Sequence, residues 1–175
     1  LVLPDRNTLP KIFVSDMDST MIEQECIDEL ADFAGFRKQI ADITDRAMKG
    51  ELDFEKALRQ RVGLLKGVDI TAIQDCLHER ITVMKGAETL VATLKKFGCK
   101  TILVTGGFTH FAEPVSELIG FDEFVANTLD IEGGRLNGKL LGPIINSKTK
   151  LETLVAEQKY QGYESSTLAI GDGAN

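Results

Sequence analysis

Hydrophobic residues form three short runs along the chain, and each run ends in small or polar residues. The runs cover residues 12–14 before Ser15-Asp16, 101–104 before Thr105-Gly106-Gly107, and 168–170 before Gly171-Asp172-Gly173. Continuous runs rich in β-branched residues are typical of strands buried on both faces, as in a parallel sheet. Ligands of open α/β sheets bind beyond the carboxyl ends of the strands, so three polar tips predict a site at that edge.

Helical periodicity appears between these predicted strands. Residues 87–97 and 147–159 carry apolar residues at helical spacing, and each segment leads into the next strand; their apolar positions are Leu90, Val91, Leu94 and Phe97, then Leu151, Leu154 and Val155. Both segments predict helices packed on the sheet. Gly133-Gly134, inside the segment 131–136, predicts the turn of a β-hairpin.

Residues 22–84 do not fit this alternation of strands and helices. Connections in such folds usually take about 2–6 residues, and this one is far longer. Four stretches in it have helical periodicity, namely 27–34, 40–47, 54–65 and 70–77, and the glycines between or inside them are Gly35, Gly50, Gly63 and Gly67. We predict a helical bundle inserted after the first strand, lying over the sheet edge as a lid.

Length, charge and cysteine content restrict the class of protein. The 175 residues suffice for one domain with an insertion, and no apolar run approaches the roughly 20 residues of a membrane span. A net charge of −7 disfavours nucleic-acid or anionic-membrane surfaces. Residues 1–10 indicate a linker, not a secretory signal. The three cysteines favour buried, reduced thiols in a cytoplasmic protein. The oligomeric state is left open.

Asp16 and Asp18 carry the sharpest chemical signal. They stand one residue apart at the end of a predicted strand, so both carboxylates reach one small volume if the chain coils there. One carboxylate can attack phosphorus or bind a metal while the other moves a proton. The alternative is a solvated turn, since Asp and Ser favour turns.

The other two strand ends offer complementary groups. Thr105-Gly106-Gly107 supplies a hydroxyl and backbone N–H groups that can approach an anion closely, although a plain strand-to-helix turn has the same composition. Asp172, between two glycines, supplies a carboxylate with room for a hydrated metal, although a plain Asp-Gly turn is again the alternative.

Together these motifs resemble the haloacid dehalogenase superfamily, and within it the phosphoserine phosphatases. The resemblance covers residues 11–175 and is carried by the segments Asp16-Met17-Asp18-Ser19-Thr20, Val104-Thr105-Gly106, Asn146-Ser147-Lys148 and Gly171 to Asn175, and by the stretches 21–28, 58–65 and 105–108. It implies an α/β fold with a Rossmann-like parallel core at 11–21 and 85–175, a helical cap at 22–84 and a small β-hairpin.

The resemblance also implies a phosphoric monoester hydrolase that uses Mg²⁺. Asp16 would be the nucleophile and Asp18 the general acid and base. Asp16 and Asp172 would bind the metal, with the backbone carbonyl of Met17 preferred to the Asp18 carboxylate as a further ligand. Thr105, Gly106, Gly107 and a lysine would hold the phosphoryl oxygens. Lys148 is preferred to its rival Lys150, and Asn175 is a further expected substrate contact.

Substrate selection is expected in the cap. By resemblance, Glu25 would bind the ammonium group of phosphoserine and Arg61 its carboxylate, with Met48 and Phe54 as apolar walls. The alternatives are surface charges for Glu25 and Arg61, and bundle core for Met48 and Phe54.

The expected activity is hydrolysis of O-phosphoserine, the last step of serine synthesis in this family. Two alternatives stay open: phosphatase or phosphotransferase activity on another small phosphorylated metabolite, and a non-catalytic domain of the same fold. The family's fourth motif continues with a carboxylate after the position of Asn175, so the core is expected to be truncated at its C-terminal side.

Overall fold

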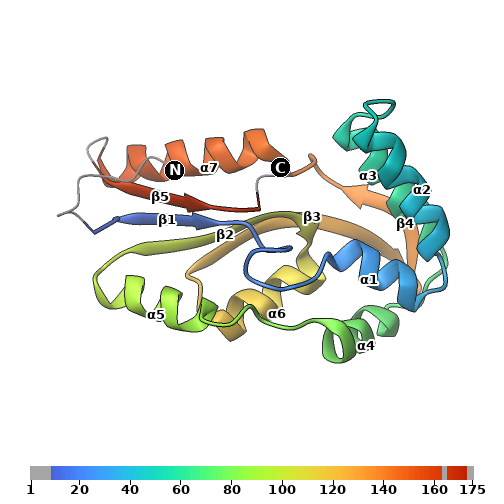
Figure 1. The fold of residues 1–175 in the computed structure, drawn as a ribbon, viewed down its shortest axis with the longest axis horizontal. Coiled ribbons are helices and arrows are strands. Elements are labelled where there is room, and N and C mark those ends of the chain that lie inside the picture. The colour runs from blue at the N-terminus through green and yellow to red at the C-terminus, as the bar shows by residue number, and fades with distance from the viewer. Residues whose placement is uncertain (1–8, 163–164, 173–175) are drawn as a thin grey trace.

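The computed structural model describes residues 9–162 and 165–172, and this part of the chain forms a sheet with helices on both faces and at one end (Figure 1). The strands are β1 (Ile12–Ser15), β2 (Lys100–Phe108), β3 (Glu123–Glu132), β4 (Arg135–Leu141) and β5 (Thr167–Ile170). The helices are α1 (Cys26–Phe33), α2 (Arg37–Met48), α3 (Phe54–Leu64), α4 (Thr71–Arg80), α5 (Ala87–Lys96), α6 (Thr109–Ile119) and α7 (Ser147–Gln161). The α/β fold predicted from the sequence is confirmed.

The three predicted strands are neighbours at one side of a five-stranded sheet of order β4-β3-β2-β1-β5. β1 pairs in parallel with both β2 and β5, so Phe13 lies opposite Thr101 on one side and Leu168 on the other. Because all three strands run the same way, their polar ends meet at one edge of the sheet.

Side chains alternate between the two faces of the sheet. Ile12, Val14, Ile102 and Val104 point to one face, where they pack with Leu154 of α7. Phe13 and Leu103 point to the opposite face, into the larger core that includes residues of α5 and α6. Burial of β1 on both faces explains its unbroken apolar sequence.

The predicted hairpin is present and adds β4 to the edge of the sheet. β3 pairs in parallel with β2 and antiparallel with β4, and Glu132 lies opposite Arg135 at the turn. Gly133 and Gly134 between them have φ angles of 58° and 78°, in the left-handed region that a tight hairpin turn requires.

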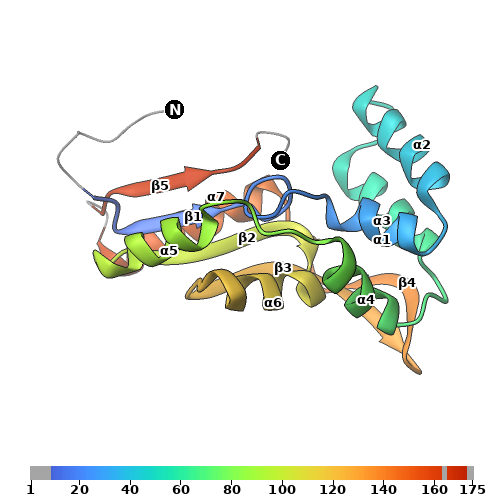
Figure 2. The same cartoon turned by 60° about the horizontal axis from the view of Figure 1, so that its bottom comes forward.

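Helices α1 to α4 form the predicted insertion between β1 and α5, and they lie at one end of the sheet (Figure 2). The two ends of the insertion are tied together, because Ile22 and Val83 form an antiparallel bridge and Met84 N donates to Met21 O at 2.8 Å. Helix α3 continues through Gly63. The division of the chain at residues 10, 21 and 84 stays a prediction.

Helix α7 differs from its sequence pattern. It has no buried residue, and Leu151 and Val155 are exposed, while Leu154 alone of the three expected core residues packs on the sheet. Helix α7 contacts β1 with one narrow side, so a pattern of three apolar residues overestimated its buried face.

The cysteines lie where their apolar neighbours predicted. Cys26, Cys76 and Cys99 are buried and unbonded. Burial raises the pKa of Cys76 and of Cys99 to about 11, so both thiols stay protonated at neutral pH.

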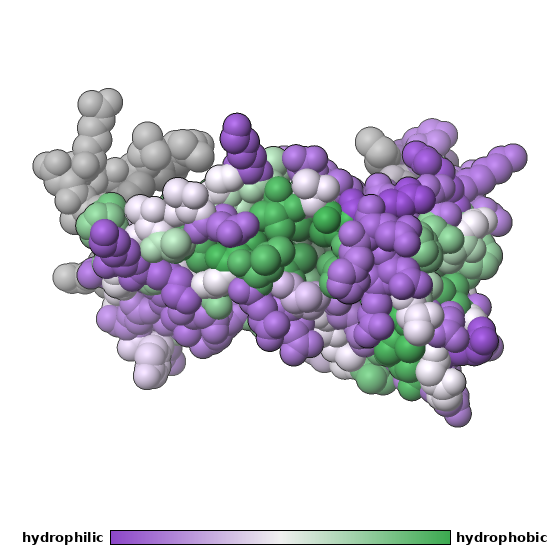
Figure 3. Space-filling model, turned by 90° about the horizontal axis from the view of Figure 1, so that it is seen from below, coloured by the Kyte–Doolittle hydropathy of each residue, from purple (hydrophilic) through white to green (hydrophobic). Residues whose placement is uncertain are grey.

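Hydrophobic residues also reach the surface. Figure 3 shows them gathered in the middle of the face that carries α5 and α6. Exposed side chains on these helices or just after them are Leu90, Phe97 and Leu118. In the described part of the chain, every helix is too short or too polar to cross a membrane.

Candidate active site

Asp16 lies at the carboxyl end of β1 and is only 4% exposed. Its Oδ1 accepts a hydrogen bond of 2.8 Å from the backbone N–H of Met17, and its Oδ2 pairs with the ammonium group of Lys150. The Asp16 backbone N–H donates to Ile170 O of β5 at 3.0 Å. A buried carboxylate held on both oxygens is fixed in one orientation, as a positioned nucleophile requires.

Asp18 joins the sheet to the cap. Its Oδ1 accepts from the backbone N–H of Cys26, the first residue of α1, at 3.0 Å, and its Oδ2 lies 3.4 Å from Thr105 Oγ1. Burial raises the pKa of the Asp18 carboxyl, and the charge of Asp16 adds to the increase. A carboxyl with a raised pKa retains its proton more readily, as a general acid must.

Thr105, Gly106 and Gly107 form an irregularity inside β2, and not a turn after it. The β2–β3 register shifts between the pairs Val104–Val125 and Phe108–Asn127, which is a bulge. The backbone N–H of Gly107 donates to Thr105 Oγ1 at 2.9 Å. The expectation that the strand ends at Val104 was wrong, because pairing with β3 resumes at Phe108.

Gly107 is the close-approach glycine of this bulge. A Cβ atom at this position would lie 2.9 Å from Asp18 Oδ2 and 2.9 Å from Met17 Cε, separations that real Cβ atoms essentially never show. The absence of a side chain at Gly107 therefore lets the Asp18 carboxylate lie directly against β2.

The structure places Lys150 at the site and Lys148 away from it. Lys150 is 17% exposed and contacts Asp16, whereas Lys148 is 79% exposed and pairs with Glu152 at 3.5 Å. Lys148 lines a separate cavity with Lys56 and Arg59. The preference for Lys148 was wrong, because residues two apart on a helix point in different directions and only Lys150 faces β1.

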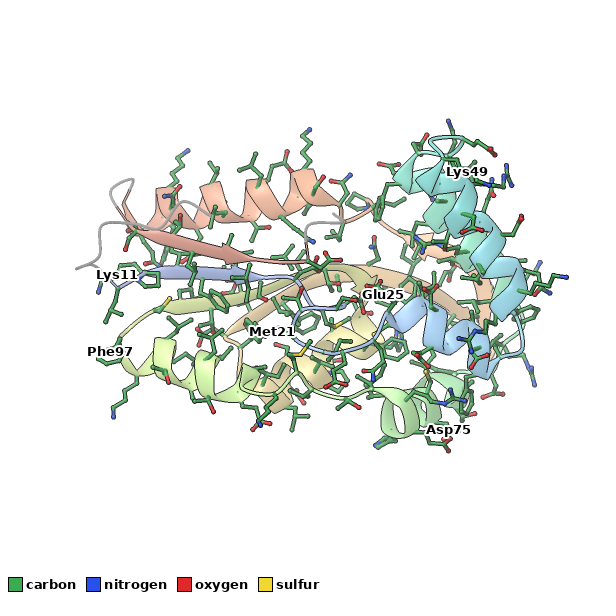
Figure 4. All side chains as sticks on the ribbon, in the orientation of Figure 1. Lys11, Met21, Glu25, Lys49, Asp75 and Phe97 are labelled. Carbon is green, nitrogen blue, oxygen red and sulfur yellow. The ribbon has the colours of Figure 1, made fainter. Side chains whose placement is uncertain are left out.

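A second cavity, of about 240 Å³, lies between cap and core at Asp18. Its residues come from the loop after β1 and from β2 on one side, and from α1 with its N-cap, α2 and α3 on the other: Asp18, Glu25, Ile27, Asp28, Thr44, Phe54, Leu58, Arg61, Gly106, Gly107 and Phe108. Figure 4 shows Glu25 at the start of α1, facing the end of the sheet. The structure thus brings Glu25, Arg61 and Phe54 together with Asp18, as the resemblance implied.

The two expected specificity residues have opposite charges inside this cavity. Glu25 accepts a hydrogen bond of 2.7 Å from Ser19 Oγ, and burial raises the pKa of its carboxyl. Burial lowers the pKa of the Arg61 guanidinium, against the charges of Asp28 and Glu25. Arg61 Nε is buried and has no hydrogen-bond partner among the described residues.

Phe54 closes the cavity against the bulge of β2. A Cβ atom on Gly106 would lie 3.2 Å from Phe54 Cζ, so the ring of this cap residue rests on the backbone of the core. The side chain of Met48 and all of Asn175, two further expected contacts, lie outside the described residues.

The oxygen donors at the strand ends suit a hard divalent cation in part. Asp172 follows Gly171, where a Cβ atom would lie 3.5 Å from Asp16 Cβ, so two carboxylates end neighbouring strands. Oxygen ligands of this kind fit Mg²⁺, which retains several waters. Within residues 9–162 and 165–172, however, no group of three or more Asp, Glu, His or Cys residues is arranged around a metal position.

The Met17 carbonyl does not fit its expected role as a metal ligand. It accepts three backbone hydrogen bonds, from Thr20 at 3.2 Å, Met21 at 2.8 Å and Ile22 at 3.1 Å. These bonds close the loop after β1 and turn the carbonyl into that loop. The preference for this ligand was wrong because the local turn already uses the oxygen.

Sequence reasoning missed two residues that contact the site's framework. Asn127 of β3 bonds the backbone of Gly106, and Asp28 of α1 faces Arg61 in the cavity. Asn127 follows the apolar run 124–126 within β3, as the polar residues at the three predicted strand ends follow theirs, and this signal could have identified it.

The fold and the site together define a class: an α/β protein with carboxylates at parallel strand ends and a helical cap over them. Residues 13–175 match the family model of haloacid dehalogenase-like hydrolases, and the chain belongs to this family. Individual relatives and solved structures give a more specific similarity.

The chain is 43% identical to the phosphoserine phosphatase of Vibrio cholerae over 169 residues, which are 96% of this chain and 51% of that protein. It spans about half the length of the first curated relatives it matches. Among solved structures it is similar to a phospho-aspartyl intermediate analogue of phosphoserine phosphatase (37% identity, TM-score 0.84, 95% of this chain and 80% of that one). It is also similar to a substrate-bound phosphoserine phosphatase complex (36% identity, TM-score 0.85, 96% and 80% covered).

Proposed function

We propose that the protein hydrolyses O-phosphoserine to serine and inorganic phosphate through an aspartyl-phosphate on Asp16. The observation that carries this proposal is the cavity in which Asp18, Gly106 and Gly107 of the core lie together with Glu25 and Arg61 of the cap. The similarity to phosphoserine phosphatases over nearly the whole chain supports it.

The cavity suits both ends of this substrate. Arg61 lines the cavity with a guanidinium that can bind the substrate carboxylate, and Glu25 offers a carboxylate for the ammonium group. At the core end, Lys150 and the Thr105 hydroxyl lie beside Asp16 and Asp18, where a phosphoryl group would be held.

The first chemical step transfers the phosphoryl group to the protein. One oxygen of Asp16 attacks phosphorus, and the bond between phosphorus and the serine oxygen breaks. Asp18, whose raised pKa favours the protonated carboxyl, gives its proton to the departing oxygen. Serine leaves as a neutral alcohol.

The second step restores the protein. Asp18, now a carboxylate, takes a proton from a water molecule, and the oxygen of this water attacks phosphorus. The bond between phosphorus and Asp16 breaks, and the Asp16 carboxylate is released with inorganic phosphate. The hydrogen bond from Cys26 N–H to Asp18 Oδ1 keeps the acid in place through both steps.

Magnesium is the cation we propose for the site, held by the carboxylates of Asp16 and Asp172. When bound, it supplies positive charge against the phosphoryl oxygens. Hydrolysis of phosphoserine would give the protein a role in serine biosynthesis. The buried free thiols support a cytoplasmic location.

The test is a steady-state assay with phosphoserine, phosphothreonine and phosphoethanolamine in the presence of Mg²⁺. Phosphoserine should give the highest kcat/KM, and Asp16→Asn should abolish turnover, because a neutral amide does not attack phosphorus. Beryllium fluoride should label Asp16 in the wild-type protein. A higher kcat/KM for another substrate would show a different phosphatase, and turnover by Asp16→Asn would overturn the mechanism.

A further inference from the structure

Asn127 is an uncharged polar residue placed where β3 passes the bulge of β2, and it is only 2% exposed. Its amide makes hydrogen bonds to two backbone segments. Nδ2 donates to Gly106 O at 2.8 Å and lies 3.4 Å from Ile145 O, and Oδ1 accepts from Ile145 N at 2.9 Å. The side chain therefore joins the bulge to the segment that leads into α7.

The bond to Gly106 has a structural cause. Because the β2–β3 register shifts between Val104 and Phe108, the backbone between them leaves the regular ladder. A buried carbonyl without a partner is costly, and the Asn127 amide supplies the missing donor to Gly106. The bulge is thus held open, with the Gly107 N–H turned to Thr105 Oγ1.

The bonds to Ile145 act on the other side of the site. Asn146 follows directly and caps α7, where its side chain accepts from the backbone N–H groups of Lys148 and Thr149. Lys150 N donates to Asn146 O at 3.1 Å in the same first turn, and the Lys150 ammonium contacts Asp16. Fixing Ile145 therefore fixes the start of α7 and the base of Lys150.

We propose that Asn127 is a positioning residue for phosphoryl transfer, which sets the Thr105–Gly107 bulge and Lys150 at a fixed separation around Asp16. The proposal rests on the function proposed above and extends it. Asn127 is buried behind Gly106, so it acts through the backbone and does not touch the substrate. Its role concerns the phosphoryl group alone, and not recognition of the amino acid.

The experiment compares Asn127→Leu with the matched control Asn137→Leu. Asn137 is a half-buried asparagine of β4, the strand next to β3. Its side chain donates to Asp130, and this hydrogen bond is remote from the site. Asn127→Leu should lower kcat by about 10²-fold, the scale of a small misplacement of reacting groups. The loss should be the same for phosphoserine and phosphoethanolamine. Asn137→Leu should keep the wild-type kcat for both.

Asn127→Asp provides a second test where the leucine variant does not fold. It retains an acceptor for Ile145 N–H and loses the donor to Gly106 O. A buried carboxyl facing two carbonyl oxygens has a raised pKa, and its protonated form restores a donor. Activity relative to the wild type should therefore be low at neutral pH and recover as the pH falls.

A calorimetric titration with inorganic phosphate separates failure of this proposal from failure of the proposed function. It needs no turnover and no choice of substrate. Asn127→Asp at neutral pH should bind phosphate more weakly than the wild type and than Asn137→Leu. Wild-type phosphate affinity together with a flat relative pH profile would overturn the role of Asn127, whatever the substrate of the wild-type protein.

Discussion

Lys148 and Lys150 are close in sequence, but their side chains point in different directions and meet different partners. Lys148 and Lys150 stand in the first turn of α7, and only Lys150 points to β1, where it contacts the nearly buried Asp16. Lys148 reaches a partner one turn along its own helix, Glu152. The contact with the Asp16 carboxylate is the reason why we propose Lys150, and not Lys148, for phosphoryl binding.

The lysine pair gives the first prediction. Lys150→Ala should lower kcat by roughly 10²–10³-fold, because it removes a charged donor from the phosphoryl oxygens. Lys148→Ala should stay close to wild type, since a surface ion pair contributes little. Both variants are compared by phosphate release under saturating phosphoserine. The opposite ranking would return the role to Lys148.

Asp18 gives a prediction about pH and stability. Its raised pKa means that the folded protein binds this proton more tightly than the unfolded chain does. The wild-type protein therefore loses stability as the pH rises from the ordinary aspartate value of 3.8 through the raised pKa. Asp18→Asn has no charge to bury, so it should be more stable than wild type above this window and not below it.

Urea unfolding of both proteins at a series of pH values, with a chelator present to remove divalent cations, measures this difference. The same variant should be inactive on phosphoserine, since the amide transfers no proton. A stability gain that is equal at acidic and neutral pH would show that ionisation of Asp18 is not its cause.

At the scale of elements, the bulge in β2 shapes the phosphoryl site. The strand leaves its ladder after Val104 and rejoins β3 at Phe108, and the residues between them face Asp18. A regular strand would use these N–H groups for pairing with its neighbour. In the irregular segment the Gly107 N–H instead donates to Thr105 Oγ1, and the two glycines let Asp18 and Phe54 approach the backbone.

Gly107→Ala tests the bulge. The added methyl group would clash with Asp18 Oδ2 and Met17 Cε, so the variant should lose about 1–3 kcal/mol of stability and most of its activity. Gly63→Ala in α3 is the control. Nothing lies within 4 Å of that position, so alanine should raise stability by about 0.5–1 kcal/mol without changing kcat. Thermal unfolding and phosphate release report the two effects, and an active Gly107→Ala protein would contradict the close approach.

At the scale of the whole molecule, neither the sheet nor the cap alone contains all the residues of the candidate site. Asp16, Thr105 and Lys150 come from the α/β layer, whereas Glu25 and Arg61 come from helical residues inserted after β1. Asp18 belongs to both, because its carboxylate bonds Cys26 N–H of the cap and Thr105 of the sheet. In the function we propose, the core carries the chemistry and the cap selects the substrate.

Arg61→Lys tests this division. Lysine keeps the positive charge and loses the planar fork that binds a carboxylate at two points. The kcat/KM for phosphoserine should fall by an amount equivalent to about 1–3 kcal/mol, while phosphoethanolamine, which has no carboxylate, should change little. Equal losses on both substrates would make Arg61 a structural residue.

The sequence by itself determined the local elements and the chemical groups at the strand ends. The unbroken apolar runs, the glycine pair of the hairpin and the long helical insertion each predicted what the structure shows, because burial periodicity and turn geometry act over a few residues. The same local signals placed Asp16, Asp18 and Thr105 at one edge. The roles of these residues remain proposals.

Only the tertiary structure decided which groups face each other. It selected Lys150 over Lys148, turned the Met17 carbonyl into a local loop, and placed Asn127 behind Gly106. It also left Leu151 and Val155 exposed on α7 despite their helical spacing. These outcomes depend on how β1, β2, β3 and α7 pack, and side-chain direction across that packing is a long-range property that no local sequence pattern encodes.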